Sequence, residues 1–263
     1  MKMPSFYVKS FLSASLLSLM ASAYAGTMGP VEPAVNWTGF YAGLNAGGIW
    51  GHSDVAWDIP AGSNLLSGSA AARTGTIVFS HGTLNNSGFM GGGQIGANYQ
   101  FNHFVLGLEG DFDYVDLSAN RNIITTVSST LISINQSMSI DWLSTVRARL
   151  GYTHKAWLLY GTGGLAIANL QYQDVGIFNN TTTFTQSSDK AETGWTLGAG
   201  LEWKFAPHWS AKVEYMYLDL DNVNYNSIRM TNATGVLDPL GSLNHDHDFT
   251  ANFARVGVNY SWA

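Results

Sequence analysis

Charged side chains at alternate positions are the groups in this sequence whose spacing could do chemistry. Glu109, Asp111 and Asp113 alternate in one segment, and Arg147 and Arg149 alternate in a later one. Alternate side chains of a β-strand share a face, so each group would project to one side of a sheet. The set is completed by Glu202, Lys204, Lys212, Glu214 and Arg255. Enclosed charges are costly unless they are paired. Opposite signs on adjacent strands therefore predict a salt-bridged plug, with an ion-conducting path as the alternative.

The densest group of potential metal ligands is the run His245-Asp246-His247-Asp248. Histidine and carboxylate at alternate positions could hold a divalent ion. Two residues on one strand face supply at most half a site, and no partner is identifiable, so a solvated loop base is favoured. Serines of the predicted loops, with His52, His81, His245 or His247, could form a Ser-His-Asp hydrolase site, but no spacing defines a triad. We predict a non-enzyme without a metal or cofactor.

Two glycine-rich runs match the dinucleotide-binding pattern, at residues 91–96 and 161–166. That motif needs a strand before it and a helix after it, whereas both runs lie inside predicted strands. Glycine at these places is better explained as letting a sheet bend or leaving room opposite bulky side chains.

Eight segments of alternating polarity would position these groups. They cover residues 39–50, 87–101, 104–117, 140–152, 157–172, 193–205, 209–220 and 249–262. The connections after the second, fourth and sixth segments are a few residues each. The other four are long and cover about residues 51–86, 118–138, 173–191 and 221–248. This layout predicts an all-β fold, an eight-stranded antiparallel transmembrane β-barrel with short periplasmic turns and four long extracellular loops.

The parity of each segment predicts which side chains face lipid. In the third segment the lipid face consists of Leu106, Leu108, Phe112 and Tyr114. In the fourth it consists of Ile140, Trp142, Val146, Ala148, Leu150 and Tyr152. In the fifth, two sets compete, Trp157, Leu159, Leu165 and Ile167 against Leu158, Tyr160, Ala166 and Ala168, and the facing stays open.

Aromatic residues near strand ends predict two girdles at the membrane surfaces. Trp195 and Trp203 share a face and are eight residues apart, which is ~26 Å along a strand and roughly 20 Å along the membrane normal. That span approaches the ~25 Å apolar band of outer-membrane barrels. A β-sandwich would instead bury its aromatic residues in mid-strand. The predicted girdle tryptophans are Trp37, Trp50, Trp142, Trp157, Trp195, Trp203, Trp209 and Trp262.

The composition excludes several classes of protein. Charged residues make up 11% of the chain, against about 25% in soluble domains. The formal net charge of -6 is unlike that of a nucleic-acid binder. The chain has no cysteine, which excludes a disulfide framework and a thiolate metal site. After the first 25 residues no stretch of 18 is continuously apolar, which excludes a helical membrane protein.

The amino terminus has the three parts of a secretory signal peptide. Lys2 and Lys9 are basic, residues 11–20 are apolar, and Ala23-Tyr24-Ala25 forms an A-x-A cleavage site. The predicted organisation is a signal peptide at 1–25, a short periplasmic segment at 26–36 and an outer-membrane barrel at 37–263. We expect the mature protein to begin at Gly26, because small residues occupy the cleavage site. Amino-terminal sequencing of outer-membrane material checks this, and recovery of intact residues 1–25 would contradict it.

Several segments together resemble a known family. The chain contains NWTGFYAGLNAGGIWG, GFMGGGQIGANYQF, VLGLEGDFDY, STVRARLGY, TGWTLGAGLEWKF and FARVGVNYSW. In this combination it is similar to the porin-like, surface-antigen family of small outer-membrane β-barrels. The resemblance covers nearly all of the chain after the signal peptide, and it implies an eight-stranded barrel in the outer membrane of a Gram-negative bacterium without fixing an activity.

The resemblance also implies partners. Outer-membrane lipid would surround the strands, and the barrel-assembly machinery would recognise the last one. Such chains usually end in an aromatic residue, whereas here Trp262 is penultimate and Ala263 is last. The expected function is that of a structural or surface-interaction protein whose loops contact a host or envelope ligand. A narrow porin and a lipid-modifying enzyme at the rim are the alternatives.

Overall fold

The computed structural model describes residues 35–59, 63, 70–127, 129–179, 182–225, 230–231, 237–238 and 244–262. The predicted signal peptide lies outside these residues, as does most of the predicted periplasmic segment. Residues 35–263 form one compact unit. No helix in the described part of the chain is long and apolar enough to cross a bilayer.

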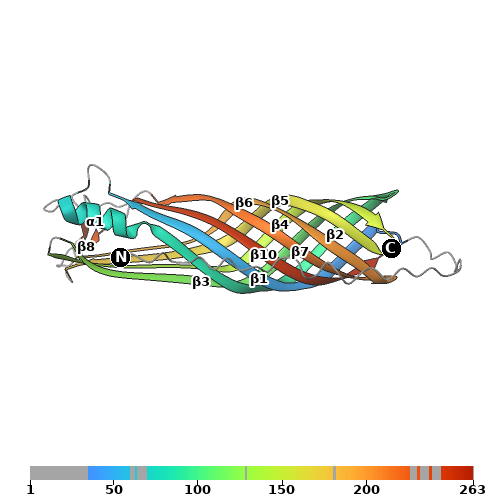
Figure 1. Ribbon diagram of the computed structural model, residues 1–263, viewed down its shortest axis with the longest axis horizontal. Helices are drawn as coiled ribbons and strands as arrows, with labels where there is room; N and C mark the ends of the chain where they lie inside the picture. The colour runs from blue at the N-terminus through green and yellow to red at the C-terminus, as the bar shows by residue number, and fades with distance from the viewer. Residues whose placement is uncertain are drawn as a thin grey trace, which may run out of the picture. The chain divides into compact units, whose positions relative to one another are not determined.

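Eight long strands form a closed antiparallel ring (Figure 1). Neighbours in the ring follow chain order, and the first and last strands pair to close it. The eight-stranded antiparallel architecture is therefore confirmed. The strands are β1 (Gly39–Asp58), β2 (Gly82–Phe101), β3 (Phe104–Val127), β4 (Thr130–His154), β5 (Trp157–Phe178), β6 (Thr182–Ala206), β7 (Trp209–Tyr225) and β10 (Asn244–Trp262).

Three smaller elements lie at the end of the ring opposite the predicted short turns. The helix α1 (Ala70–Ser80) follows β1, and the two-residue strands β8 (Met230–Thr231) and β9 (Leu237–Asp238) extend the edge of β6. Figure 1 shows α1 and β8 together at that end. The expected short connections are present at the other end, where Asn102 and Lys155 have positive φ of 53° in two of them.

Two of the four expected long loops are strands instead. Residues 118–138 continue β3 and β4 as far as a turn around Ser129, and residues 173–191 continue β5 and β6 as far as Asn179. Paired residues run without a break from Leu117 and Ile140 to Val127 and Thr130. The β-branched residues of this hairpin, among them Ile123, Ile124, Ile132 and Ile134, favour extended backbone.

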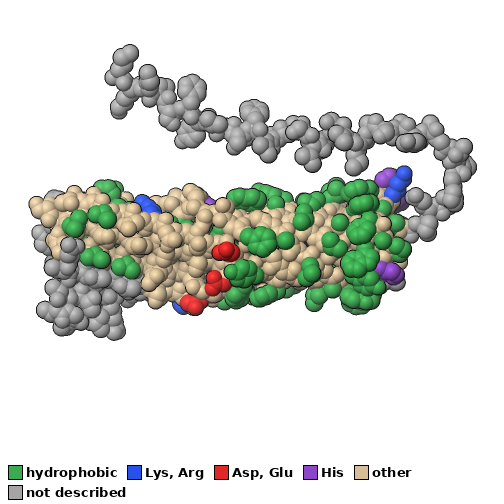
Figure 2. Space-filling view, turned by 90° about the horizontal axis from the view of Figure 1, so that it is seen from below, with side chains coloured by type: hydrophobic (Ala, Val, Ile, Leu, Met, Phe, Trp, Pro, Cys, Tyr) green, Lys and Arg blue, Asp and Glu red, His purple; other side chains and the backbone are tan. Residues whose placement is uncertain are grey.

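Polarity reverses along β3 while parity stays the same. In β3 the outward residues are apolar as far as Tyr114 and the inward ones are acidic as far as Asp113. Beyond that point Asp116 and Ser118 face outward, and Val115 and Leu117 face inward. Figure 2 shows the apolar side chains crowding the short-turn half of the barrel, with a mostly polar surface over the other half. One half is thus built for lipid outside, and the other for water outside and an apolar core inside.

A β-bulge corrects part of the predicted lipid face. The β4–β5 register shifts between Ile140 and Leu143, so that Ile140 points inward and is 2% exposed. Asp141, predicted to be inward, is exposed. The extra residue of a bulge switches the face of everything beyond it, which an unbroken alternation cannot anticipate. In β5 the open question is resolved, because Trp157, Leu159, Leu165 and Ile167 face outward.

Candidate functional site

The lumen of the lipid-facing half contains a network of ion pairs, built around Arg147 on β4. The strand register places Arg147 opposite Glu109 of β3. Its guanidinium donates to Glu109 and, at 2.6 Å, to Asp111. All three side chains have no exposed surface. The predicted meeting of these acids with Arg147 is therefore present as direct contact.

Arg255 joins the same acids from the last strand. It donates to Asp113 at 2.8 Å, to Asp111 at 2.9 Å and to Glu214 at 2.8 Å. Because β10 and β3 are separated by β1 and β2 in the ring order, Arg255 joins parts of the barrel wall that are not neighbours. The network therefore links strands across the lumen as well as occupying it.

Two further bases complete the network. Arg149 contacts Glu202 at 2.7 Å, and its guanidinium lies 3.9 Å from the centroid of the Tyr160 ring. Lys212 lies 3.0 Å from both oxygens of Glu109 and 3.2 Å from Glu214. Neutral side chains donate further hydrogen bonds to Glu109, Glu214 and Glu202. Tyr41 donates to Glu109, Tyr160 to Glu214, and Ser210 and Asn259 to Glu202.

Two glycines make room for those tyrosines. A Cβ at Gly96 would collide with the ring of Tyr41, and one at Gly200 with the ring of Tyr160. The dinucleotide-like runs containing Gly96 and Gly164 lie wholly inside β2 and β5. These glycines thus serve packing within a sheet.

Lys204 and Trp37 lie apart from where the sequence predicted them. Lys204 is not in the charge network; its ammonium donates to the carbonyl of Asn36 at 2.9 Å and lies 5.6 Å from the ring of Trp37. Trp37 is 6% exposed and packs with Val105, Leu158 and Tyr160 instead of joining the girdle. Trp37 precedes β1, so strand parity does not hold it on the lipid face, and it fills the short-turn mouth.

The other predicted girdle tryptophans lie on the outside of the barrel. Trp157 stacks on Trp203 with centroids 5.7 Å apart, and Trp142 stacks on Phe112 at 5.8 Å. Trp195 contacts Tyr217, and Trp209 contacts Tyr260. Trp50 is 50% exposed and Trp262 is 57% exposed.

Beyond the charges, the lumen of the opposite half is filled by an apolar core. Its members point inward from β1, β2, β3, β4, β5, β7 and β10 and are almost fully buried. They include Ile49, Trp57, Met90, Leu117, Ile134, Leu143, Met216, Leu218, Phe249 and Phe253. The described lumen is thus occupied in three successive layers: the Trp37 cluster, the charge network and this core.

The helix α1 is fastened over the end of the apolar core by Arg121 of β3. Its guanidinium donates to the carbonyls of Phe79 at 3.3 Å, Ser80 at 3.2 Å and His81 at 3.1 Å, and to the side chain of Gln136 at 3.0 Å. A cation at a helix carboxyl end satisfies free carbonyls and complements the helix dipole. Nothing in the sequence spacing signals this contact, because Arg121 lies in an expected loop.

We expect Arg121→Ala to loosen α1, at a local cost of about 1–3 kcal/mol from lost charged hydrogen bonds. Cleavage by trypsin after Arg73, inside α1, should become faster than in the parent. Lys155→Ala, which removes an exposed cation at the other end, is the control. Equal cleavage rates in all three proteins would contradict the fastening role.

Within the part of the lumen that the structure describes, the arrangement provides packing and ion pairing. Within the described residues, no three His, Cys, Asp or Glu side chains are placed to hold a metal ion. The backbone of His245–Asp248 belongs to β10, and the side chains of 245–247 lie outside the described residues. The predictions about that run stay untested.

Comparison with known proteins identifies the family. A family model described as outer membrane protein beta-barrel domain matches residues 10–261. The chain belongs to this outer-membrane barrel family. The resemblance to small surface-antigen barrels is thereby confirmed, and the protein is an outer-membrane protein.

Curated relatives of the outer-membrane barrel include antigens of Brucella melitensis. A 31 kDa outer-membrane immunogenic protein is 33% identical over 82% of this chain and 89% of its own length. A 25 kDa outer-membrane immunogenic protein is 27% identical over 95% and 96%. Among solved structures, Neisserial surface protein A matches with a TM-score of 0.34 and 13% identity, covering 86% of this chain and 98% of that one. The outer membrane protease OmpT of Escherichia coli matches with a TM-score of 0.44 and 10% identity, covering 85% and 97%.

Sequence reasoning missed the neutral partners of the barrel's charge network. Tyr41 and Tyr160 have the inward parity of their strands, which Tyr41 shares with the buried Asn45 on β1 and Tyr160 with the buried Thr162 on β5; that parity was the available signal. Both were treated as lipid-facing candidates or passed over, because aromatic residues in barrels usually mark the girdles.

Proposed function

We propose that this outer-membrane barrel is a surface-exposed structural and interaction protein. Its contacts with host or envelope ligands would be made by the extramembrane wall, which is the part of the strands beyond the apolar band, and by the helix α1 at its end. The observation behind the proposal is the reversal of polarity along the strands. In β3 the outward face is polar from Asp116 to Asn122. From Tyr114 to the end of β3 the strand rises roughly 30 Å at the usual rise and tilt. A rigid polar wall of that height presents a large surface outside the membrane.

The porin alternative is weakened by the filled lumen. Eight strands leave an interior just wide enough for side chains, and here charged and apolar layers occupy it in series. Conduction would need both layers to open. The relatives from Brucella melitensis are named outer-membrane immunogenic proteins, and these names mention no catalysis. This supports an interaction role over a rim enzyme.

The extramembrane wall is tested by single-cysteine labelling, since the chain has no native cysteine. We expect Ser118→Cys on intact cells to react with a membrane-impermeant maleimide, because Ser118 is exposed and faces outward beyond the girdle. Ala148→Cys, on the lipid-facing band of β4, is the matched control and should stay unlabelled. Protection of Ser118→Cys in folded protein would contradict the proposed orientation.

The interaction role needs a separate readout. A variant lacking residues 119–138 removes the outer β3–β4 hairpin and keeps the ladder below it. We expect cells carrying this variant to lose adhesion to host surfaces or envelope material while the barrel still inserts. Unchanged adhesion for this deletion and for removal of residues 174–187 would argue against the proposal.

A further inference from the structure

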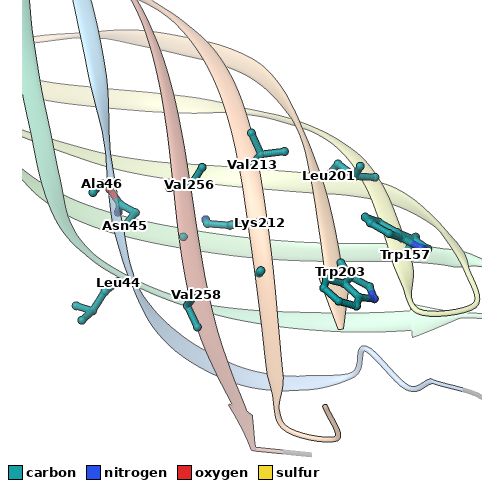
Figure 3. A pocket seen from close by; sticks show the side chains of 12 residues that line it. Leu44, Asn45, Ala46, Trp157, Leu201, Trp203, Lys212, Val213, Val256 and Val258 are labelled. Atoms are coloured by element: carbon teal, nitrogen blue, oxygen red, sulfur yellow. The ribbon is translucent and has the colours of Figure 1, made fainter. Parts of the chain in front are cut away.

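An apolar groove crosses the lipid-facing surface of β1, β10, β7, β6 and β5. Its volume is about 650 Å³, within the ~300–1,000 Å³ range of small-molecule sites. Figure 3 shows Leu44 at one side, Val256, Val258 and Val213 along the middle, and Leu201, Trp203 and Trp157 at the other side. Most of this lining is aliphatic or aromatic.

Small side chains create the hollow. Ala211 lies between Trp203 on β6 and Val258 on β10 in the paired register, and Ala46 is paired with Val256. Around them Leu44 is 74% exposed, Trp203 44% and Val258 44%. The floor is therefore a strip of short side chains with taller ones on both sides. A single flexible hydrocarbon chain fits such a strip better than a flat or bulky partner does.

The groove opens toward the short-turn end, where the charge is one-sided. Trp157 and Trp203 are stacked there, and aromatic pairs of this kind mark the level of lipid headgroups. Lys155 is exposed two residues before Trp157, and His208 is exposed one residue before Trp209. At this end the described residues carry no outward carboxylate. Figure 2 shows basic and histidine side chains at this end, with the acidic ones near mid-barrel.

We propose that the groove binds one acyl chain of an anionic glycerophospholipid of the periplasmic leaflet, with its headgroup at the short-turn end that carries Lys155 and His208. Packing of the acyl chain supplies the attraction. In the groove each CH₂ group makes close van der Waals contacts with the walls, and these contacts add up along the acyl chain. The basic rim selects the headgroup by charge.

A second copy of the chain is a poorer occupant. Two barrels related by a two-fold axis would place the same patch against itself. The groove of one barrel would then face the groove of the other, and neither would be filled. A stable interface also needs about 800 Å² of complementary surface on each partner, which two concave strips on curved walls do not provide.

The site is tested by native mass spectrometry of the full mature protein in detergent, with phosphatidylglycerol or phosphatidylethanolamine added. We expect one phosphatidylglycerol to be retained per chain, with phosphatidylethanolamine retained about tenfold more weakly. Ala211→Phe fills the floor and should abolish retention, as should Val213→Trp if Ala211→Phe fails to fold. Ala148→Phe adds the same bulk on β4, opposite β10 in the ring, and should leave retention unchanged.

The headgroup is tested by charge reversal. Lys155→Glu should remove the preference for phosphatidylglycerol, whereas Lys190→Glu, in the outer part of β6, should keep it. Equal retention by the parent and both groove-filling variants would overturn the site. So would equal retention of the two lipids by the parent, or a dimer that Ala211→Phe dissociates.

Discussion

Leu108→Arg is expected to destabilise the folded barrel by about 2–4 kcal/mol, the cost of an arginine on the lipid face near the membrane midplane. Leu108 is 64% exposed and lies on β3 between Phe104 at one end of the apolar band and Tyr114 at the other. The arginine would have to replace lipid contact with a charge far from either interface. Urea titration of the protein in lipid vesicles, followed by tryptophan fluorescence, measures the loss.

Ser118→Arg is the matched control for this prediction. It places the same side chain on the same strand and the same outward face, ten residues further along. Because Ser118 lies beyond the reversal of polarity, the arginine would be in water and the stability should change little. Similar losses at the two positions would contradict the assignment of the membrane band to the short-turn half.

Arg147→Ala is expected to cost up to about 3–5 kcal/mol, because it removes one of the bases paired with the buried carboxylates of Glu109 and Asp111. Asp111 would keep Arg255, at 2.9 Å, and Glu109 would keep Lys212 at 3.0 Å. The remaining bases would then each be shared by more acids. Lys155→Ala, which removes an exposed cation, should change stability by a few tenths of a kcal/mol at most. Unfolding in detergent, read from the heat-dependent shift in gel migration, compares the two.

Removing the charge of a second residue should recover part of that loss. Arg147→Met with Asp111→Asn deletes one contacting base and acid, while Arg255 retains Asp113 and Glu214.

Conductance adds an independent readout. Because the apolar core lies in series with the charges, the leak should stay small even in Arg147→Ala. Stable, well-resolved channels in the unmutated protein would contradict the closed lumen and favour a porin.

The part of the fold predicted from the sequence is the part governed by lipid. Lipid demands an unbroken apolar outward face, so alternation alone located eight strands and assigned Leu106, Val146 and Leu150 to the outside. Beyond the membrane that demand ends. Water outside and an apolar core inside reverse the signal, and residues 118–138 therefore looked like a loop.

The candidate site was predictable to the extent that strand parity controls it. Parity placed Glu109, Arg147 and Arg255 inside, and neighbouring strands brought the charges into contact. It failed at Ile140, where a bulge adds a residue, and at Trp37, which lies before the first strand. Lys204 has inward parity but lies two residues after Glu202, near the end of β6. Its long side chain therefore reaches the carbonyl of Asn36 instead of the charge network.

The seam between β1 and β10 decides how the ring can form. Phe40 pairs with Trp262 across almost the whole mature chain, whereas β2 to β7 each pair with strands next to them in sequence. Contacts of such high sequence separation form slowly, so closure waits for the strand that is synthesised last. Until then β1 and the newest strand carry open hydrogen-bonding edges, which invite pairing with other chains. A chain that stopped before Asn244 would lack β10 and so lose its pairing with both β1 and β7. It would remain an open sheet whose two unpaired edges can pair with other chains.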